Sequence, residues 1–419
     1  AAGPWLGALA ALRRQPDRPK SRALVALLAL AARVPFLLHA PVGSDDWYRY
    51  LWDGRVARAG INPYRYAPAA AALSHLRDAV LWPHINHPTI PTIYPPLAQV
   101  AFLVAPSLWV WKALVLAADA AIALVLAAWL RRSGADPRRA LVWAWCPLVI
   151  AELALDGHVD GLAIALLVAA LALGAARPLS AGLLLGASFA AKLLAGALLP
   201  AVAQSAGGSQ AVRASVPPVV RAARPGRARV YLGFAAATAV SLLPYANVGP
   251  KMLAGLEVYG RKWVAAPGAY ALIYQATCRA VTIGRDPSAR ILHAPRLGPL
   301  ITGDPGRADV FPDELANVLA RALVALVVLS LLGLAIRRHL APTDAGLLVL
   351  GAFLLLTPAL LPWYVLWVVP LLAFRPALPL LALVALAPLL HVPGAGALVH
   401  LSVWIVILAI ALISLRKSV

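Results

Sequence analysis

Charged residues are scarce in this sequence. Only 13% of its 419 residues are Asp, Glu, Lys or Arg, whereas 62% are hydrophobic and the mean hydropathy is +0.79. Soluble domains usually carry about 25% charged residues, because a polar surface must surround a limited core. The shortage of charge therefore excludes a soluble globular protein and places most of the chain in a lipid bilayer.

Cysteine and acidic residues are also rare. The two cysteines, Cys146 and Cys278, lie far apart, which argues against a disulfide framework. With 17 acidic against 37 basic side chains, the net charge is +20. The basic residues are spread through the gaps between apolar runs rather than gathered in one patch, so they indicate membrane topology and contact with anionic lipids. We predict membrane lipids as partners and no nucleic acid.

Alternating strand patterns are missing as well. The apolar runs recur from Ser21 to the C-terminus and are long and uniform, unlike the strands of an outer-membrane barrel. A helix crosses a hydrocarbon core of about 30 Å with about 20 apolar residues, and it satisfies its own backbone hydrogen bonds. The predicted fold class is all-α: a polytopic integral membrane protein with about 11–12 transmembrane or re-entrant helices.

Basic residues at the ends of the apolar runs orient the chain. Residues 1–21 form a basic cytoplasmic leader before the first span, and Arg131-Arg132 closes the second span on the same side. Residues 40–108 between these spans then form a loop on the non-cytoplasmic face. The same rule makes residues 246–314 a second external loop and places both termini inside.

The apolar runs make residues 22–419 a single transmembrane domain. The predicted spans are 22–39, 109–130, 140–153, 161–175, 230–245, 315–336, 343–360, 363–374, 377–391 and 399–415. Residues 178–204 have basic residues on both sides, so they must cross an even number of times, yet roughly 26 residues are too few for two full spans. We predict an out-and-back pair of short or kinked helices with Lys192 near the turn. The alternative is one tilted span with the following Arg-rich loop outside.

The first external loop carries the main candidates for chemistry. Its sequence begins Ser44-Asp45-Asp46-Trp47-Tyr48. Two adjacent carboxylates beside aromatic rings suit a general base or a cation site, since desolvation raises the basicity of a carboxylate. Alternatively, Asp45 or Asp46 caps a surface helix that starts at Trp47, because Asp is a favoured N-cap residue. Both hold together if Asp45 caps the helix and Asp46 acts in the site.

Other polar groups give weaker signals. His84 and His87 are of a metal-binding type but have no supporting ligands at a suitable spacing, and Pro88 indicates a bent backbone instead. We therefore predict no metal site and no cofactor beyond, at most, a loosely bound divalent cation. Asp119 lies inside a span, where a structural hydrogen bond and a functional role are equally consistent with the sequence.

A polar turn between the third and fourth spans faces the same side as the first loop. It runs from Glu152 to Asp160, and within it Asp156, His158 and Asp160 form a polar cluster. The alternative interpretation is an ordinary interfacial turn. Lys192, at the turn of its helix pair, needs an anion, for which a phosphate is the obvious candidate. Snorkelling of its ammonium group to the interface is the competing account.

Several motifs follow one another along nearly the whole chain. They are Asp45-Asp46-Trp47-Tyr48-Arg49-Tyr50-Leu51-Trp52-Asp53-Gly54, Gly60-Ile61-Asn62-Pro63-Tyr64, Tyr94-Pro95-Pro96, Lys112 with Asp119, Gly157-His158-Val159-Asp160, Lys192, and Pro362-Trp363-Tyr364-Val365-Leu366-Trp367. Together, though not singly, they resemble the GT-C glycosyltransferases. The similarity is greatest to bacterial mannosyltransferases that use polyprenyl-phosphate-mannose, and it is more distant to the enzyme that adds the first mannose to the GPI glycolipid precursor.

The resemblance implies a GT-C fold in the bacterial plasma membrane with its active site on the extracytoplasmic side. Such an enzyme takes a hexose from a polyprenyl-phosphate-linked donor and passes it to a lipid or glycan acceptor of the cell envelope. Its catalytic base is an acid in the first external loop, which maps to Asp46 or Asp45; Asp46 is favoured because it stands one helical turn before Tyr50. Mannose is implied by the resemblance alone, since glucose, galactose or a pentose makes similar demands on an acidic, aromatic cleft.

The expected reaction is a direct displacement with inversion at the anomeric carbon. Asp46 deprotonates the acceptor hydroxyl, while Lys192, with Arg261 or Lys262, neutralises the leaving phosphate. The other residues expected to bind the donor or the sugar are Tyr48, Trp52 and Trp363, which stack on sugar faces, His158 with Asp160, which position a sugar or the head group, and Arg49 and Tyr94 from the motifs.

Two other classes of function are consistent with parts of the sequence. In a secondary transporter for a small polar or anionic solute, Asp119, Glu152 and Lys192 are ligands for ions or substrate. That class predicts internal repeats, of which the sequence has no convincing example, and lacks so long a structured first loop. A lipid-binding scaffold without catalysis leaves the acidic pair without a purpose.

Overall fold

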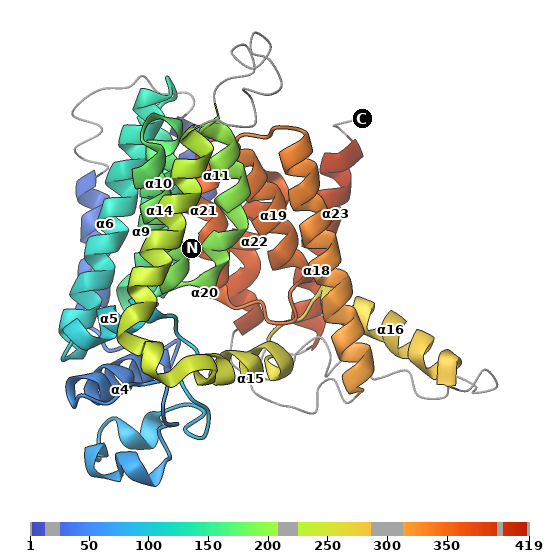
Figure 1. The fold of residues 1–419 in the computed structure, drawn as a ribbon. Helices are drawn as coiled ribbons and strands as arrows, with labels where there is room; N and C mark the ends of the chain where they lie inside the picture. Colours follow the sequence, from blue (N-terminus) through green and yellow to red (C-terminus); the bar gives the residue numbers. More distant parts are fainter. Residues whose placement is uncertain (1, 13–25, 208–224, 286–312, 392–396, 417–419) are drawn as a thin grey trace. The chain divides into compact units, whose positions relative to one another are not determined.

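The chain is helical throughout the part that the structure describes. The computed structural model describes residues 2–12, 26–207, 225–285, 313–391 and 397–416, and within these ranges the β structure is limited to one isolated bridge between Ala265 and Ala359 (Figure 1). The predicted all-α fold class is therefore confirmed.

Within the described ranges, three helical stretches are long and apolar enough to cross a membrane: Leu108–Arg132, Pro225–Lys262 and Glu314–Arg337. Eight shorter apolar helices of 10–17 residues accompany them: Ala26–Leu37, Asp160–Ala176, Pro178–Ala191, Leu193–Ser205, Pro342–Leu356, Pro362–Leu372, Leu378–Leu390 and Val399–Ile410. Length and composition thus agree with a polytopic membrane protein, as the spacing of apolar runs predicted.

The chain divides into two compact units, Ala1–Glu257 with His339–Thr343, and Val258–Arg338 with Asp344–Val419. Helices of the first unit are α1 (Ala2–Leu12), α3 (Val34–Leu37), α4 (Asp46–Arg58), η1 (Ala71–Leu76), η2 (Trp82–His84), α5 (Pro96–Val104), α6 (Leu108–Arg132), η3 (Pro137–Ala140), α7 (Leu141–Ala144), α8 (Pro147–Val149), η4 (Ile150–Leu155), α9 (Asp160–Leu173), η5 (Gly174–Ala176), α10 (Pro178–Ala191), η6 (Leu193–Leu198), α11 (Leu199–Ser205), α14 (Pro225–Leu242) and η7 (Leu243–Leu253). Helix α15 (Ala254–Lys262) runs from the first unit into the second, and α19 (Pro342–Leu356) also begins in the first. The second unit contains α16 (Ala269–Arg285), α18 (Glu314–Arg337), α20 (Pro362–Val365), η8 (Leu366–Val368), α21 (Val369–Leu372), α22 (Leu378–Leu386), η9 (Ala387–His391) and α23 (Ala397–Arg416).

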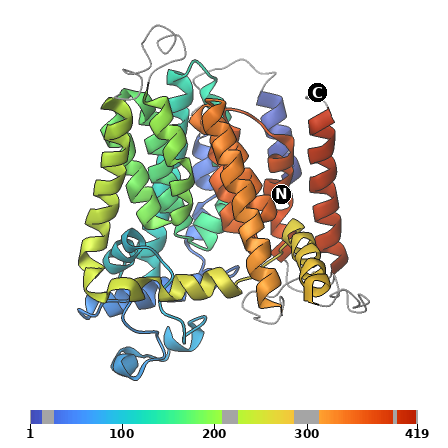
Figure 2. The same ribbon diagram turned by 45° about the vertical axis from the view of Figure 1, so that its right-hand side comes forward.

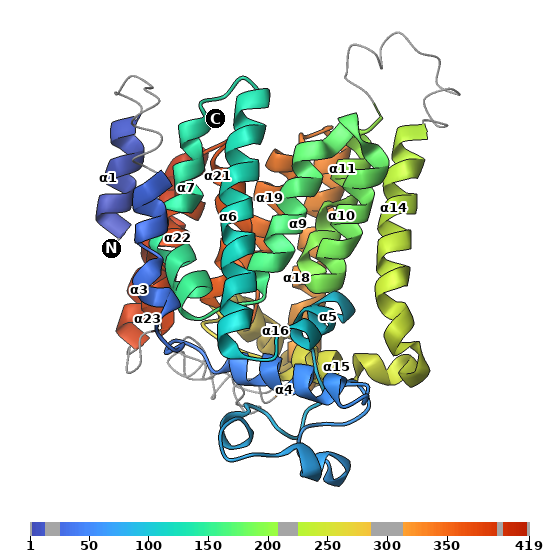
Figure 3. The ribbon, with the colours of Figure 1, turned by 90° about the vertical axis from the view of Figure 1, so that its left-hand side faces the viewer.

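In the first unit, α6, α9, α10 and α14 stand side by side (Figures 1 and 3). Figure 3 also shows α4 lying across the lower end of α6, with the rest of the first loop beyond it. Helix α6 begins after Ser107, whose hydroxyl accepts a hydrogen bond from the Val110 N–H, and it ends at the basic pair Arg131-Arg132. The loop that carries the acidic pair is therefore attached to a closely packed set of apolar helices.

Glycines allow α10 and α14 to approach closely. A Cβ atom added at Gly182 would lie 2.2 Å from the backbone oxygen of Val230, and one at Gly186 would lie 2.4 Å from that of Phe234. From the other side, a Cβ at Gly233 would lie 2.4 Å from the Leu179 oxygen. Small residues of this kind let helix backbones pack directly against one another in a membrane, where no hydrophobic force drives them together.

Substitution of Gly182 therefore tests this packing. We expect Gly182→Ala to lower the free energy of unfolding by about 1–3 kcal/mol, because the new methyl group meets backbone atoms and forces the helices apart. Thermal unfolding in detergent measures the loss. Gly333→Ala is the matched control, since a Cβ at this helical position meets nothing within 4 Å. Equal losses of stability in both variants would contradict the close approach.

The second unit has its own core around α16 and α18, which lie against each other in Figure 2, coloured gold and orange. Tyr270 and Tyr274 of α16 are buried there against Ala316 and Ala320 of α18. The Tyr270 hydroxyl donates a hydrogen bond to the Asn317 side-chain oxygen at 2.6 Å. The buried aromatic face of α16 is thus fixed to α18 by both packing and a polar contact.

Residues 178–205 break at Lys192, as the sequence predicted. Helix α10 ends at Ala191, Lys192 has an extended backbone, and the helical segments η6 and α11 follow. The predicted span over 140–153 differs from the structure, because it is divided into α7, α8 and the π-helical turn η4. The division occurs at Cys146-Pro147, where proline has no N–H to continue a helix.

Residues 2–12 of the predicted leader form the helix α1, which was not expected from the sequence. The basic part of that leader, residues 13–20, lies outside the described residues. So do residues 208–224 of the Arg-rich loop and residues 286–312 of the predicted second external loop.

Candidate active site

The two adjacent acids lie at the start of α4, which begins at Asp46. Asp45 occupies the N-cap position, but its side chain makes no capping hydrogen bond. Instead, the side-chain amide of Asn86 donates to Asp45 Oδ1 at 2.8 Å and to Asp46 Oδ1 at 3.0 Å. One amide therefore ties both carboxylates to the far part of the loop. Asp45 therefore stands at the predicted N-cap position, but its carboxylate does not cap the helix.

The second oxygen of Asp46 faces the membrane helices. The Tyr50 hydroxyl lies 3.5 Å from Asp46 Oδ2, one helical turn along α4, and His158 Nδ1 lies 4.0 Å from the same oxygen. The Asp46 side chain is 21% exposed, whereas that of His158 is 1% exposed. Asp46 is thus the carboxylate at the boundary between solvent and the buried polar groups.

Burial keeps Tyr50 neutral. The loss of hydration raises the pKa of the Tyr50 hydroxyl well above its ordinary value, and the charges of Asp46 and Asp160 raise it further. The ring packs against Phe102 and Trp111, which hold it in place. Tyr50 is therefore a fixed hydrogen-bond donor beside Asp46.

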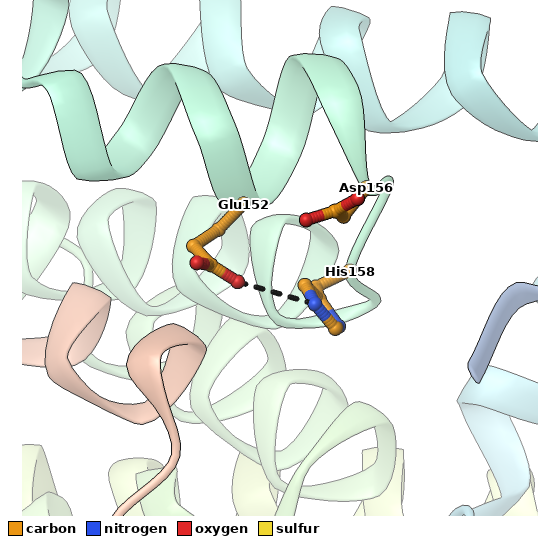
Figure 4. Close-up of side chains that lie close together, drawn as sticks. All are labelled: Glu152, Asp156 and His158. Carbon is orange, nitrogen blue, oxygen red and sulfur yellow. Dashed lines mark ion pairs between the residues drawn. The ribbon is translucent and has the colours of Figure 1, made fainter. Parts of the chain in front are cut away.

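His158 connects Asp46 to a second carboxylate. Its Nε2 atom lies 3.2 Å from Glu152 Oε2, so the ring stands between two acids (Figure 4). Glu152 comes from η4, and His158 follows the turn at Gly157, whose φ of +69° favours glycine. The indole N–H of Trp111 donates to the Gly157 carbonyl at 2.7 Å and fixes this turn against α6.

Glu152, Asp156 and His158 form the group of ligand types that could hold a metal ion within the described ranges. All three are buried, and one ligand atom from each lies within 4.8 Å of the others. The sequence placed Glu152 at the start of the same polar turn as Asp156 and His158, but it did not predict that these three side chains bring their ligand atoms together. The three residues are spaced by four and then by two positions, and this spacing brings their ligand atoms together only through the fold of η4 and the turn after it.

Lys192 has a carboxylate partner in the protein. Its Nζ atom lies 2.9 Å from Asp160 Oδ2 at the start of α9, and the Asp160 side chain is fully buried. The break in the helices at Lys192 thus brings its ammonium to the same polar turn as His158. The anion that the sequence required for Lys192 is, in this structure, an aspartate.

Other predicted donor-binding residues support the loop from within. Trp52 is 1% exposed and packs in a small core with Val56, Leu73 and Ile85, which leaves no ring face for a sugar. Arg49 is buried in an ion pair with Asp53 at 3.0 Å and donates to the Ile90 carbonyl. Tyr94 is buried with its ring edge-on to Tyr50. In this structure Trp52 and Tyr94 therefore make packing contacts, and Arg49 makes polar contacts, with other residues of the first loop.

Tyr48 keeps part of its surface exposed and stacks between Trp47 and His84, with ring centroids 3.7 and 4.8 Å away. Arg261 and Lys262, at the exposed end of α15, and Trp363, whose ring is edge-on to Tyr364, belong to the second unit. Their assignment to donor binding stays a prediction.

The charged residues inside α6 have structural partners. Asp119 forms a buried ion pair with Arg33 and accepts a hydrogen bond from the Trp143 indole at 2.8 Å. The Lys112 ammonium donates to the carbonyl oxygens of Phe36 and His39. Of the two alternatives for Asp119, the structure therefore favours the structural one.

Comparison with known proteins gives one family match, which lies within the first unit. Residues 2–207 match the model of the MptA_B family, whose description is alpha-(1->6)-mannopyranosyltransferase, N-terminal domain. No curated protein and no solved structure matches the chain significantly. The matched range contains the acidic pair, the polar turn and Lys192.

Proposed function

We propose the donor, the acceptor and the base of this protein from the match of residues 2–207 to the N-terminal domain of the alpha-(1->6)-mannopyranosyltransferase family, a match that makes the protein a glycosyltransferase. The reaction class is mannosyl transfer, in agreement with the resemblance to bacterial GT-C mannosyltransferases. We propose that the donor is polyprenyl-phosphate-mannose, that the acceptor is a lipid or glycan, and that transfer occurs at the extracytoplasmic face of the plasma membrane.

One observation carries the proposal: Asp46 presents a carboxylate at the edge of a buried polar site. Its Oδ1 atom is fixed by Asn86 and its Oδ2 atom by Tyr50, so the group is held in one orientation while 21% of the side chain is exposed. A positioned carboxylate of this kind is suited to accept a proton from a hydroxyl group in the transition state.

The reaction needs little more chemistry, because the donor is already activated. The acceptor oxygen attacks the anomeric carbon as its proton passes to Asp46. The new C–O bond forms while the bond from the anomeric carbon to the phosphate oxygen breaks. The electron pair of that bond leaves with the polyprenyl phosphate, and attack from the opposite face inverts the anomeric configuration.

The leaving phosphate gains negative charge, which cations stabilise. Lys192 is the proposed partner in the first unit, because its ammonium has three N–H donors and Asp160 lies at hydrogen-bond distance from it. Asp160 then positions the ammonium. The assignment of Arg261 and Lys262 to the phosphate stays a prediction from the sequence.

The structure does not favour the transporter alternative, which needs Asp119, Glu152 and Lys192 as ligands for ions or substrate. Asp119 is paired with Arg33, and Lys192 is paired with Asp160, so two of the three residues that a transporter would use as ligands have partners inside the first unit. The family match provides the positive case for an enzyme.

Removal of the Lys192 ammonium tests the phosphate contact. We expect Lys192→Ala to weaken donor binding by about tenfold, because one charge-assisted hydrogen bond contributes about 1.5–3 kcal/mol. Lys192→Arg should restore part of the affinity. The measurement is the Kd of polyprenyl-phosphate-mannose for protein in detergent. Unchanged affinity in the alanine variant would exclude the contact.

The reaction itself is tested with purified protein, isotope-labelled polyprenyl-phosphate-mannose and a membrane-lipid acceptor. The proposal predicts labelled glycolipid and an equal amount of polyprenyl phosphate, with the anomeric configuration of the product opposite to that of the donor. Retention of configuration in the product would contradict the direct displacement.

A further inference from the structure

The group formed by Glu152, Asp156 and His158 is a distinct feature next to Asp46. One ligand atom of each lies within 4.8 Å of the others, all three side chains are buried, and all come from η4 and the turn after it (Figure 4). Two ligands on opposite sides of a six-coordinate divalent ion are about 4–5 Å apart, and two adjacent ligands are about 3 Å apart. The 3.2 Å separation of Glu152 Oε2 and His158 Nε2 fits an adjacent pair.

The three side chains are held by neighbouring groups in the way that metal ligands usually are. A histidine that binds a metal through one ring nitrogen usually directs the other towards a carboxylate. Here Nε2 faces the group, and Nδ1 faces Asp46 Oδ2 at 4.0 Å. Asp156 is also held from outside, since its Oδ1 atom accepts hydrogen bonds from the N–H groups of Val42 at 3.1 Å and Gly43 at 2.9 Å.

Gly43 makes room for Asp156. A Cβ atom at Gly43 would lie 2.3 Å from Asp156 Oδ2, so only glycine lets the loop backbone reach this carboxylate. The start of the first loop is thereby attached to the polar turn, and Asp156 is oriented before any ligand binds.

The charge of the group points to a cation. Glu152 and Asp156 are 8% and 6% exposed, and buried carboxylates are costly unless a positive charge compensates them. Among the residues that the structure describes, Lys192 pairs with Asp160 and Arg33 pairs with Asp119, while no lysine or arginine forms an ion pair with Glu152 or Asp156. Lys112 interacts with Asp156 electrostatically, but its ammonium donates its hydrogen bonds to the carbonyl oxygens of Phe36 and His39. Glu152 and Asp156, with Asp46 as a third carboxylate nearby, therefore have one imidazole ring as the basic group in direct reach.

We infer that Glu152, Asp156 and His158 bind one divalent transition-metal ion, of the Mn²⁺ or Zn²⁺ type. Mixed carboxylate and imidazole ligands suit these ions, and three protein ligands leave a position open for water or substrate. The ion would put positive charge beside Asp46 and the polar turn. The inference does not depend on the proposed donor, since ion binding is measured without any sugar substrate.

The experiment uses Mn²⁺ as the probe with full-length protein that has been treated with a chelator. Titration followed by electron paramagnetic resonance should give one bound Mn²⁺ per chain. Glu152→Gln and Asp156→Asn should each weaken binding by at least about tenfold. Asp78→Asn is the control, because its carboxylate belongs to the same loop region but pairs with Arg55. Zn²⁺ should displace the bound Mn²⁺.

A pulsed electron paramagnetic resonance measurement on the unmodified protein tests the site even if the variants fail to fold. Mn²⁺ bound at this site should show coupling to an imidazole nitrogen, which a weakly held surface ion would not. The inference is overturned if the unmodified protein binds no Mn²⁺, if the bound ion lacks nitrogen coupling, or if folded variants bind it as tightly as the parent does. In those cases Glu152 and His158 form an ion pair without a metal ion, and the proposed mannosyl transfer stands or falls on its own tests.

Discussion

Asp46→Asn is expected to lower the rate of mannosyl transfer by about 10²–10⁴-fold. The amide has the size of the carboxylate and keeps a hydrogen-bonding contact with the loop, but it cannot accept a proton from the acceptor hydroxyl, and general base catalysis contributes an effect of this size. Donor affinity should be unchanged, because the substitution leaves the phosphate contacts in place. Initial rates with labelled donor and separate binding measurements distinguish the two effects.

Two further variants control this result. Asp344→Asn removes a carboxylate that also lies in the first turn of a helix but pairs with Arg375 in the second unit, and it should retain activity. Asp45→Asn asks which acid of the pair is the base. If Asp45→Asn abolishes transfer while Asp46→Asn is active, the roles of the two acids are exchanged.

The buried pair of Arg33 and Asp119 should have the largest effect on stability. We expect Asp119→Leu to lower the free energy of unfolding by about 3–5 kcal/mol, because the arginine is left charged and buried without its partner. The side chains are 10% and 1% exposed, so water cannot replace the lost contact. Thermal unfolding in detergent, with each single variant and the double variant Arg33→Met with Asp119→Leu, gives the coupling between them.

An exposed pair provides the matched control for this cycle. Arg375 and Asp344 lie 3.6 Å apart, but the arginine side chain is 73% exposed, and such pairs contribute about 0–1 kcal/mol. The double variant of the buried pair should be more stable than either single variant. A small loss in Asp119→Leu, equal to that of the exposed pair, would show that Asp119 is not held by Arg33 and would reopen its functional interpretation.

The helices of the membrane core could be predicted from sequence because their signal is local. The span predicted over 109–130 is observed as Leu108–Arg132, since the apolar run, the Ser107 cap and the basic pair all lie within the segment. The break at Lys192 was also predictable, because its flanking charges left too few residues for two full spans. Pro147 indicated a possible helix break at Cys146-Pro147, but the long apolar run around it favoured the prediction of one continuous span.

The partners of the polar residues could not be predicted, because they depend on how distant segments pack. Arg33 meets Asp119 from 86 residues away, and Asn86 reaches back 41 residues to Asp45. For the same reason, Trp52 was expected at a sugar surface although it lies in a small core. An aromatic residue in a loop has the same local pattern in both cases, and only the tertiary structure distinguishes them.

The donor is the central claim, and a competition between two labelled donors tests it most directly. Purified protein with a membrane-lipid acceptor receives polyprenyl-phosphate-mannose labelled with ¹³C and a nucleotide-linked mannose labelled with deuterium. Mass spectrometry of the product should show only ¹³C, and Asp46→Asn should show no label above background. Deuterium in the product of the unmodified protein, with ¹³C absent, would contradict the account.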